Sequence, residues 1–168
     1  FVVAHFHLIM GVAAIFGMFA GVSFWFPKFF GRMMSEGMGK AHFWLTFIGV
    51  YAIFGPMHYL GIIAHPRRYA ETTSVDYLGA AGANEIHYFV TIAAMITVTA
   101  QCLFLINVVW SLFRGKRVSS DNPWEATTLE WVTATPPAYD NFEGRIPTVN
   151  HGPYEFSVPG ASRDYVMQ

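Results

Sequence analysis

The sequence contains few charged residues, one cysteine and no excess of either charge sign. Charged side chains make up 12% of its 168 residues, about half of the roughly 25% typical of globular domains. A net charge of −1 excludes the strongly basic surface with which proteins bind nucleic acid. Cys102 stands alone, which excludes an internal disulfide and a thiolate metal cluster.

Long apolar runs take the place of the missing charges. Hydrophobic residues make up 54% of the chain, and they gather in three runs that each reach the roughly 20 residues a helix needs to cross a bilayer. We therefore predict an all-α integral membrane protein, with three transmembrane helices followed by an irregular polar tail. The predicted segments are helices at 1–27, 41–64 and 86–113, a loop at 28–40, an outer loop at 65–85 and the tail at 114–168.

Basic residues predict which side of the membrane each connection faces. The first loop and the tail share one side, because two crossings separate them. The opposite side carries Arg67 and Arg68. The positive-inside rule therefore places the first loop and the tail in the cytoplasm. The six basic residues on which this assignment rests are Lys28, Arg32, Lys40, Arg114, Lys116 and Arg117.

The two ends of the chain differ in character. The chain opens with Phe1 inside an apolar run, without the Met and basic n-region of a signal peptide. We therefore expect it to be the C-terminal part of a longer membrane protein. Residues 118–168 hold six of the nine prolines and show no helical or strand period. We expect that part to be extended against partner proteins or partly disordered.

Two histidines, His5 and His7, stand one residue apart in an apolar run without a formal charge. Successive residues of an α-helix turn by about 100°, so the two side chains should point about 160° apart at nearly the same depth. They cannot chelate one metal ion, but each can bind a different one. Haem iron commonly takes an axial imidazole, so one interpretation is a helix between two haems, with Phe6 in the same turn. The other is that both histidines form hydrogen bonds inside a helix bundle.

A pair of arginines follows the second run. Arg67 and Arg68 come directly after Pro66. A guanidinium binds carboxylates bidentately and stays ionised, which suits the propionates of a haem. An ordinary interfacial pair is the alternative. Since the first helix is predicted to run inward from the side of the arginines, His5 and His7 lie at a compatible depth.

The remaining polar residues of the apolar runs give weaker signals. We interpret His42, His87 and His151 as ordinary boundary or tail residues. His58 and His65 stay open between contact with a cofactor edge and a hydrogen bond at the interface. Polar residues of the third run are expected to face the bundle interior and bond to neighbouring helices; they are Thr91, Thr97, Thr99, Gln101 and Asn107.

Three stretches carry a resemblance to a known family. VVAHFH in the first run, PRRY after the second and NPWEATTLEWVTATPPAYDNF in the tail resemble subunit I of the haem–copper terminal oxidases. The greatest similarity is to bacterial cytochrome c oxidases of the mitochondrial-like type. The resemblance extends to about residue 142 and implies that the three helices are the last three of a twelve-helix bundle.

The resemblance implies a role for each residue of the HFH motif. His5 matches the proximal ligand of the high-spin haem iron, where oxygen binds, and His7 matches one of two axial ligands of the low-spin haem iron. Phe6 matches the residue on the short electron route between the haems. His5 and Phe6 are therefore the expected catalytic residues.

The resemblance also covers the arginine pair. Arg67 and Arg68 match the arginines that hold haem propionates, and His58 matches a histidine near the propionates. The iron ligands match the family pattern, and the departures from it lie around the expected propionate site. Gly55 and Met57 stand in place of the commoner Phe and Gln, and Ala64 and His65 in place of Gly and Met.

The implied function is that of the catalytic subunit of a proton-pumping oxidase in the bacterial plasma membrane, which reduces O2 to water with electrons from cytochrome c. The implied cofactors are two haems, of haem a type, and a copper whose ligands lie outside this chain. The implied partners are the rest of subunit I, subunits II and III, cytochrome c or another donor, and the lipid bilayer. The alternatives are a quinol oxidase of the same superfamily, a more distant nitric oxide reductase, and a non-redox helix bundle or transporter with structural histidines.

Overall fold

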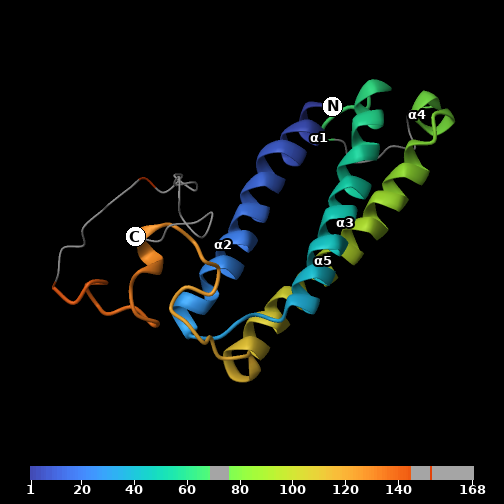
Figure 1. The fold of residues 1–168 in the computed structure, drawn as a ribbon. Coiled ribbons are helices and arrows are strands. Elements are labelled where there is room, and N and C mark those ends of the chain that lie inside the picture. The colour runs from blue at the N-terminus through green and yellow to red at the C-terminus, as the bar shows by residue number, and fades with distance from the viewer. Residues whose placement is uncertain (69–75, 145–151, 153–168) are drawn as a thin grey trace, which may run out of the picture. The chain divides into compact units, whose positions relative to one another are not determined.

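Helices dominate the computed structural model, which describes residues 1–68, 76–144 and 152 (Figure 1). Within those ranges the chain forms no β-strand, apart from an isolated bridge between Arg32 and Arg117. Three described helices are long and apolar enough to cross a membrane: Val2–Phe30, Glu36–Ile62 and Ala83–Arg114. The predicted all-α membrane class is confirmed. Tyr69 of the PRRY motif and His151 lie outside the described residues.

The first long helix is not uniform. It starts as α1 (Val2–Phe6), continues as a π-helical turn, η1 (His7–Gly11), and returns to α-helical geometry in α2 (Val12–Phe30). A π-helix bonds residue i to residue i+5 and occurs mostly as a single turn inside an α-helix, frequently at a functional site. The predicted angle between the side chains of His5 and His7 assumes a regular α-helix. That geometry ends at His7, where the π-turn begins.

The first helix ends at Phe30 and not at Pro27, the predicted boundary. Pro27 lies inside α2. The backbone N–H of Gly31 donates to the Pro27 carbonyl at 2.9 Å, and Gly31 has a φ of 64°. A left-handed glycine that makes this bond is a strong helix stop, whereas an internal proline removes one hydrogen bond of the helix.

The other boundaries also differ from the prediction. Helix α3 (Glu36–Ile62) begins before residue 41, because Glu36 and Lys40 form an ion pair of 2.7 Å across its first turn. A carboxylate there also interacts favourably with the helix dipole. The predicted outer loop at 65–85 contains a short helix, α4 (Asp76–Ala80), and α5 (Ala83–Arg114) begins before residue 86. Hydropathy alone does not detect these polar helix ends.

Two compact units make up the chain, one of residues 1–20 and 36–107 and one of residues 21–35 and 108–168. In the first unit α3 and α5 approach closely at Gly49. A Cβ added to Gly49 would collide with the side chain of Thr97 on α5. Small residues allow this close backbone approach in membrane helix pairs.

A polar network lies between the same two helices. Gln101 on α5 pairs with the His42 ring through its Oε1 at 2.9 Å, and its Nε2 donates to the Thr46 hydroxyl at 3.0 Å. His42 is buried, so it is an interior bundle residue and not the boundary residue that was predicted. The predicted bonds to neighbouring helices are found for Gln101, but Thr91 and Thr99 make no such bond among the described residues. Both are exposed, and their hydroxyls donate to carbonyls of their own helix.

An apolar cluster joins the end of α3 to α4 and to the start of α5. Its buried members are Leu60, Leu78 and Ala83, with Ile63 and Ile86 packed against them. Burial of such side chains is the main stabilising contribution that this contact can make. The cluster therefore stabilises the end of α3, after which the loop with Arg67 and Arg68 begins.

The described part of the tail, up to residue 144, packs on its own chain in the second unit and is not an extended segment there, whereas residues 145–151 and 153–168 lie outside the described residues. The side chain of Lys28 is buried, and its Nζ donates to the carbonyls of Asp121 and Thr133 and lies 3.4 Å from the Thr135 hydroxyl. A buried ammonium group needs such acceptors. The tail supplies them from backbone without regular secondary structure, so its sequence shows no period.

Aromatic contacts hold the same part of the tail. The Trp124 indole N–H donates to the Phe24 carbonyl at 2.8 Å. Trp131, in the short 3-10 helix η2 (Leu129–Trp131), is buried, and its ring lies 5.0 Å from that of Phe24. The described tail is therefore a folded cap on the end of α2.

Replacing Gly49 with alanine should destabilise the α3–α5 pair, because the new methyl group meets Thr97. Forcing an extra methyl into a packed interface costs roughly 1–3 kcal/mol. We expect a lower thermal melting temperature for the purified membrane complex with Gly49→Ala. Gly37→Ala is the control, since a Cβ at Gly37 meets nothing within 4 Å. Equal melting temperatures would contradict the close packing.

Replacing Lys28 with methionine should loosen the tail, because it leaves the carbonyls of Asp121 and Thr133 without their donor. An unsatisfied buried polar group costs about 1–3 kcal/mol. We expect faster amide hydrogen exchange and faster proteolysis in residues 121–135. Lys40→Met, at an exposed position, is the control. The same protection in both variants would show that Lys28 does not hold the tail.

Candidate functional site

The ring of His7 is held by a hydrogen bond to its own helix. Its Nδ1 lies 2.8 Å from the carbonyl oxygen of Val3, one turn earlier. A carbonyl can only accept, so Nδ1 carries the proton and donates it. The neutral imidazole then presents a lone pair at Nε2. A backbone carbonyl bonded to the other ring nitrogen is the usual way in which a protein orients a metal-binding histidine.

The ring of His5 has a different environment. It lies with its centroid 6.3 Å from the ring of Phe1 and 6.3 Å from the ring of His58 on α3. Its side chain is exposed, and no hydrogen bond joins its ring nitrogens to another residue within 1–68 and 76–144. The interpretation of His5 as a hydrogen-bonding residue of the bundle therefore has no contact to support it.

Both histidines border the same helix, α3. The ring of His7 stacks on Phe54 at 5.4 Å with the ring planes 12° apart. The ring of His58, next to His5, lies one turn further along α3, and its Nδ1 donates to the Phe54 carbonyl at 2.6 Å. His58 thus has the same tautomer as His7, by the same argument. These two ring contacts could not be predicted from the sequence, because the residues that meet are about fifty positions apart.

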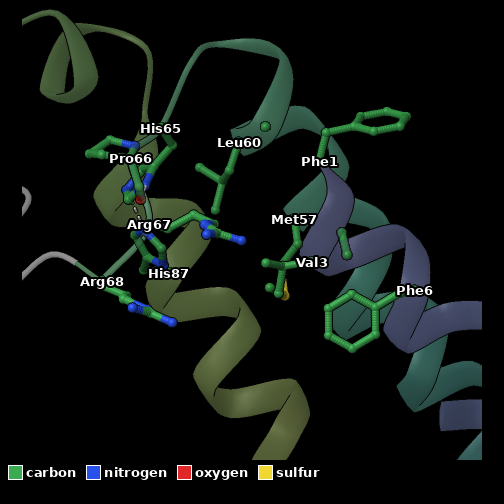
Figure 2. A pocket seen from close by; sticks show the side chains of 12 residues that line it. Phe1, Val3, Phe6, Met57, Leu60, His65, Pro66, Arg67, Arg68 and His87 are labelled. Carbon is green, nitrogen blue, oxygen red and sulfur yellow. Dashed lines mark hydrogen bonds between the residues drawn. The ribbon is translucent and has the colours of Figure 1, made fainter.

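A cavity of about 450 Å³ brings the HFH motif and the arginine pair together (Figure 2). In Figure 2 the guanidinium of Arg67 points from the loop toward Val3 and Met57. This cavity, which we call the arginine cavity, joins residues that are about sixty positions apart in the sequence. Among its lining residues are Val3 and Phe6 of α1, Met57 of α3, Arg67 and Arg68 of the loop, and His87 of α5.

Arg67 and Arg68 are both exposed in this chain. The ion pair found in the described residues is the one between Glu36 and Lys40, so no described carboxylate neutralises the two arginines. Arg68 has a φ of 55°, an uncommon backbone conformation for a residue other than glycine. Two guanidiniums that line a largely apolar cavity, beside His65 and His87, suit an anionic ligand.

A second cavity, of about 380 Å³, lies on the other side of the motif and is lined by His7. We call it the apolar cavity. Side chains of α2, α3 and α5 form its walls, among them Ile15, Phe16, Val50, Phe54 and Val98, with Thr46, Thr97 and Gln101 as its polar lining residues. Phe6 and His7 are consecutive in sequence, yet they line different cavities.

The arrangement fits a haem group. A haem requires an imidazole nitrogen for its iron, apolar walls for its macrocycle and cationic partners for its propionates. His7 offers Nε2 beside the apolar cavity, and the arginine cavity has a cationic rim. Residues 1–68, 76–144 and 152 contain no group of three His, Cys, Asp or Glu side chains placed to hold a metal ion.

Another histidine pair lines the arginine cavity. The Nε2 atoms of His65 and His87 lie 2.9 Å apart, with ring centroids 4.8 Å apart. Sequence reasoning missed this pair. His87 had been interpreted as an ordinary boundary residue, and a separation of 22 positions carries no signal that the two rings meet.

Comparison with known proteins shows the family of the chain. Residues 1–98 match the family described as "Cytochrome C and Quinol oxidase polypeptide I". The chain belongs to this family. The match includes the HFH motif, the arginine pair and the first turns of α5, so the two cavities lie largely inside the matched region.

Similar proteins come from several bacteria. The chain is 47% identical over its whole length to alternative cytochrome c oxidase subunit 1 of Bradyrhizobium diazoefficiens. It is 43% identical to cytochrome c oxidase subunit 1 of Synechocystis and 40% identical to that of Thermostichus vulcanus, each over 94% of the chain. It spans 28% of the first relative and 27% of the other two.

Proposed function

We propose that the chain is the C-terminal part of the catalytic subunit of a proton-pumping terminal oxidase, which reduces O2 to water with electrons from cytochrome c. The proposal rests on one observation above all. In a chain of this family, His7 is held through Nδ1 by the Val3 carbonyl and keeps Nε2 for a ligand. This arrangement orients the ring and leaves Nε2 available to bind a metal ion.

His5 and His7 each bind the iron of one haem in this proposal, the high-spin haem at His5 and the low-spin haem at His7. Each haem, when bound, supplies a one-electron redox centre, and the high-spin one also supplies a site for oxygen. Phe6 lies between the two histidines and is the expected residue on the electron route. The side chains orient the haems, and the apolar walls around them exclude water.

Arg67 and Arg68 bind the haem propionates in this proposal. Their position at the rim of the arginine cavity, without a described carboxylate partner, supports that role. Two guanidiniums raise the local positive potential, which favours the reduced haem, because reduction adds a negative charge. They also stabilise ionised propionates, and in this way the pair couples reduction to proton movement. His58, beside His5, lies nearer to the high-spin site and does not line either cavity.

The rest of the enzyme lies outside this chain. We propose that the three helices are the last three of twelve, that copper ligands come from earlier helices of subunit I, and that subunits II and III complete the complex. The enzyme is a multi-pass protein of the bacterial plasma membrane with a cytoplasmic C-terminus, as the distribution of basic residues predicts. Haem a is the expected haem type.

A quinol oxidase is the second candidate, because the description of the matching family includes both donors. The relatives described above are named for cytochrome c, which favours the first candidate. The test is oxygen uptake by the purified complex with reduced cytochrome c and, separately, with a quinol. Oxygen uptake with the quinol but not with cytochrome c would identify the quinol as the electron donor. The haem assignments would stay unchanged.

Replacing the histidines one at a time tests the haem assignments. We expect His7→Leu to remove the low-spin haem bands from the reduced-minus-oxidised spectrum of the parent complex, and His5→Leu to remove carbon monoxide binding at the high-spin haem. Oxygen uptake should fall by more than the roughly 10–100-fold that is typical of losing an outer-shell partner of a metal site. Tyr88→Phe, at an exposed position, is the control. A full haem spectrum in both histidine variants would overturn the proposal.

Replacing the arginines tests the propionate assignment. We expect Arg67→Gln and Arg68→Gln each to lower the midpoint potential of a haem, since a positive charge beside it is lost. A tenfold change in its reduction equilibrium constant corresponds to about 59 mV for one electron. Proton pumping, measured as acidification outside reconstituted vesicles, should fall with it. Unchanged potentials and unchanged pumping would remove the arginines from the mechanism.

A further inference from the structure

The pair of His65 and His87 has no role in the function proposed above. His65 lies in the loop that follows α3, and His87 lies near the start of α5. Their Nε2 atoms are 2.9 Å apart, and their ring planes are inclined at 71°. This is hydrogen-bond distance between two nitrogens, so one ring donates and the other accepts.

The direction of the bond follows from a second contact. The Nδ1 of His65 lies 2.9 Å from the carbonyl oxygen of Pro66. The carbonyl can only accept, so Nδ1 of His65 carries a proton, and Nε2 of the neutral ring is an acceptor. His87 therefore donates its Nε2–H to His65. Each ring has a defined role in one directed bond between the loop and α5.

Two further hydrogen bonds hold the loop at Ala64 and His65. The backbone N–H of His65 donates to the Leu60 carbonyl at 3.0 Å, and the Tyr77 hydroxyl donates to the Ala64 carbonyl at 3.3 Å. Ala64 has a φ of 59°, so the chain turns sharply just before the pair. Beyond it come Pro66 and then the two arginines.

We propose that the bond between His65 and His87 positions Arg67 and Arg68 at the arginine cavity and thereby helps to set the haem potential. All four side chains line this cavity (Figure 2). The bond ties the residue two positions before Arg67 to a long helix. Without it, the arginine side chains, which are exposed and have long flexible stems, sample more positions. This inference rests on the proposed function, because it requires a haem whose propionates meet the arginines.

The experiment compares leucine and glutamine at the two positions in the purified parent complex. Leucine removes the bond, whereas glutamine at position 87 can still donate an amide N–H to Nε2 of His65. We expect His65→Leu and His87→Leu each to lower the midpoint potential of the haem whose propionates meet the arginines. The expected change in the reduction equilibrium constant is about threefold to tenfold, which is about 28 to 59 mV for one electron.

Two comparisons separate positioning from a general loss of stability. The double variant His65→Leu/His87→Leu should lower the potential no further than either single change, because all three remove the same bond. His87→Gln should restore most of the potential. Tyr88→Phe, the exposed neighbour of His87, should leave it unchanged. Additive single effects, or a glutamine variant that behaves like leucine, would overturn the inference.

The outcomes also separate this inference from the proposed function. Unchanged potentials in the leucine variants, together with lowered potentials in Arg67→Gln, would overturn the positioning role and leave the haem assignment intact. A wild-type complex without haem bands would overturn both. If the leucine variants fail to assemble, His65→Met replaces them, since the family pattern accepts Met there. Its potential should fall below that of the wild type, and an unchanged potential would overturn the inference.

Discussion

The hydrogen bond from Nδ1 of His7 to the Val3 carbonyl is the contact on which the site depends. It settles which ring nitrogen is protonated, and it leaves the other one for a ligand. The bond closes across α1, so the helix orients one of its own side chains. Because His7 also begins the π-turn, the local backbone geometry and the orientation of the ring are linked.

The two cavities on either side of the motif divide the chemical requirements of the site. The arginine cavity has a cationic rim and suits charged groups, whereas the apolar cavity beside His7 suits a large apolar one. Phe6 and His7 line one cavity each, so a single peptide unit separates two environments of different polarity.

The structural features that could be predicted from the sequence depend on local composition. The features that could not be predicted depend on contacts between residues far apart in the sequence. The three apolar helices were predictable because crossing a bilayer demands length and hydropathy. The end of α2 at Phe30 was missed, because proline commonly ends a helix but α2 continues through Pro27. The capping of Lys28 by residues 121–135 and the pairing of His65 with His87 were missed for another reason. The residues that meet in these contacts are 22 to 107 positions apart in the sequence. Neither the tail nor the loop around His65 has a periodic pattern.

The π-turn at His7–Gly11 has a consequence for any comparison or redesign of this helix. A turn of i to i+5 bonds holds one more residue than an α-helical turn, so it acts as a one-residue insertion in the helical repeat. A helical wheel drawn through Val2–Phe30 as one regular helix would assign faces wrongly on one side of the turn. Deleting a single residue between His7 and Gly11 would remove the extra residue, so the helix would become regular without a rotation of the HFH motif relative to α2.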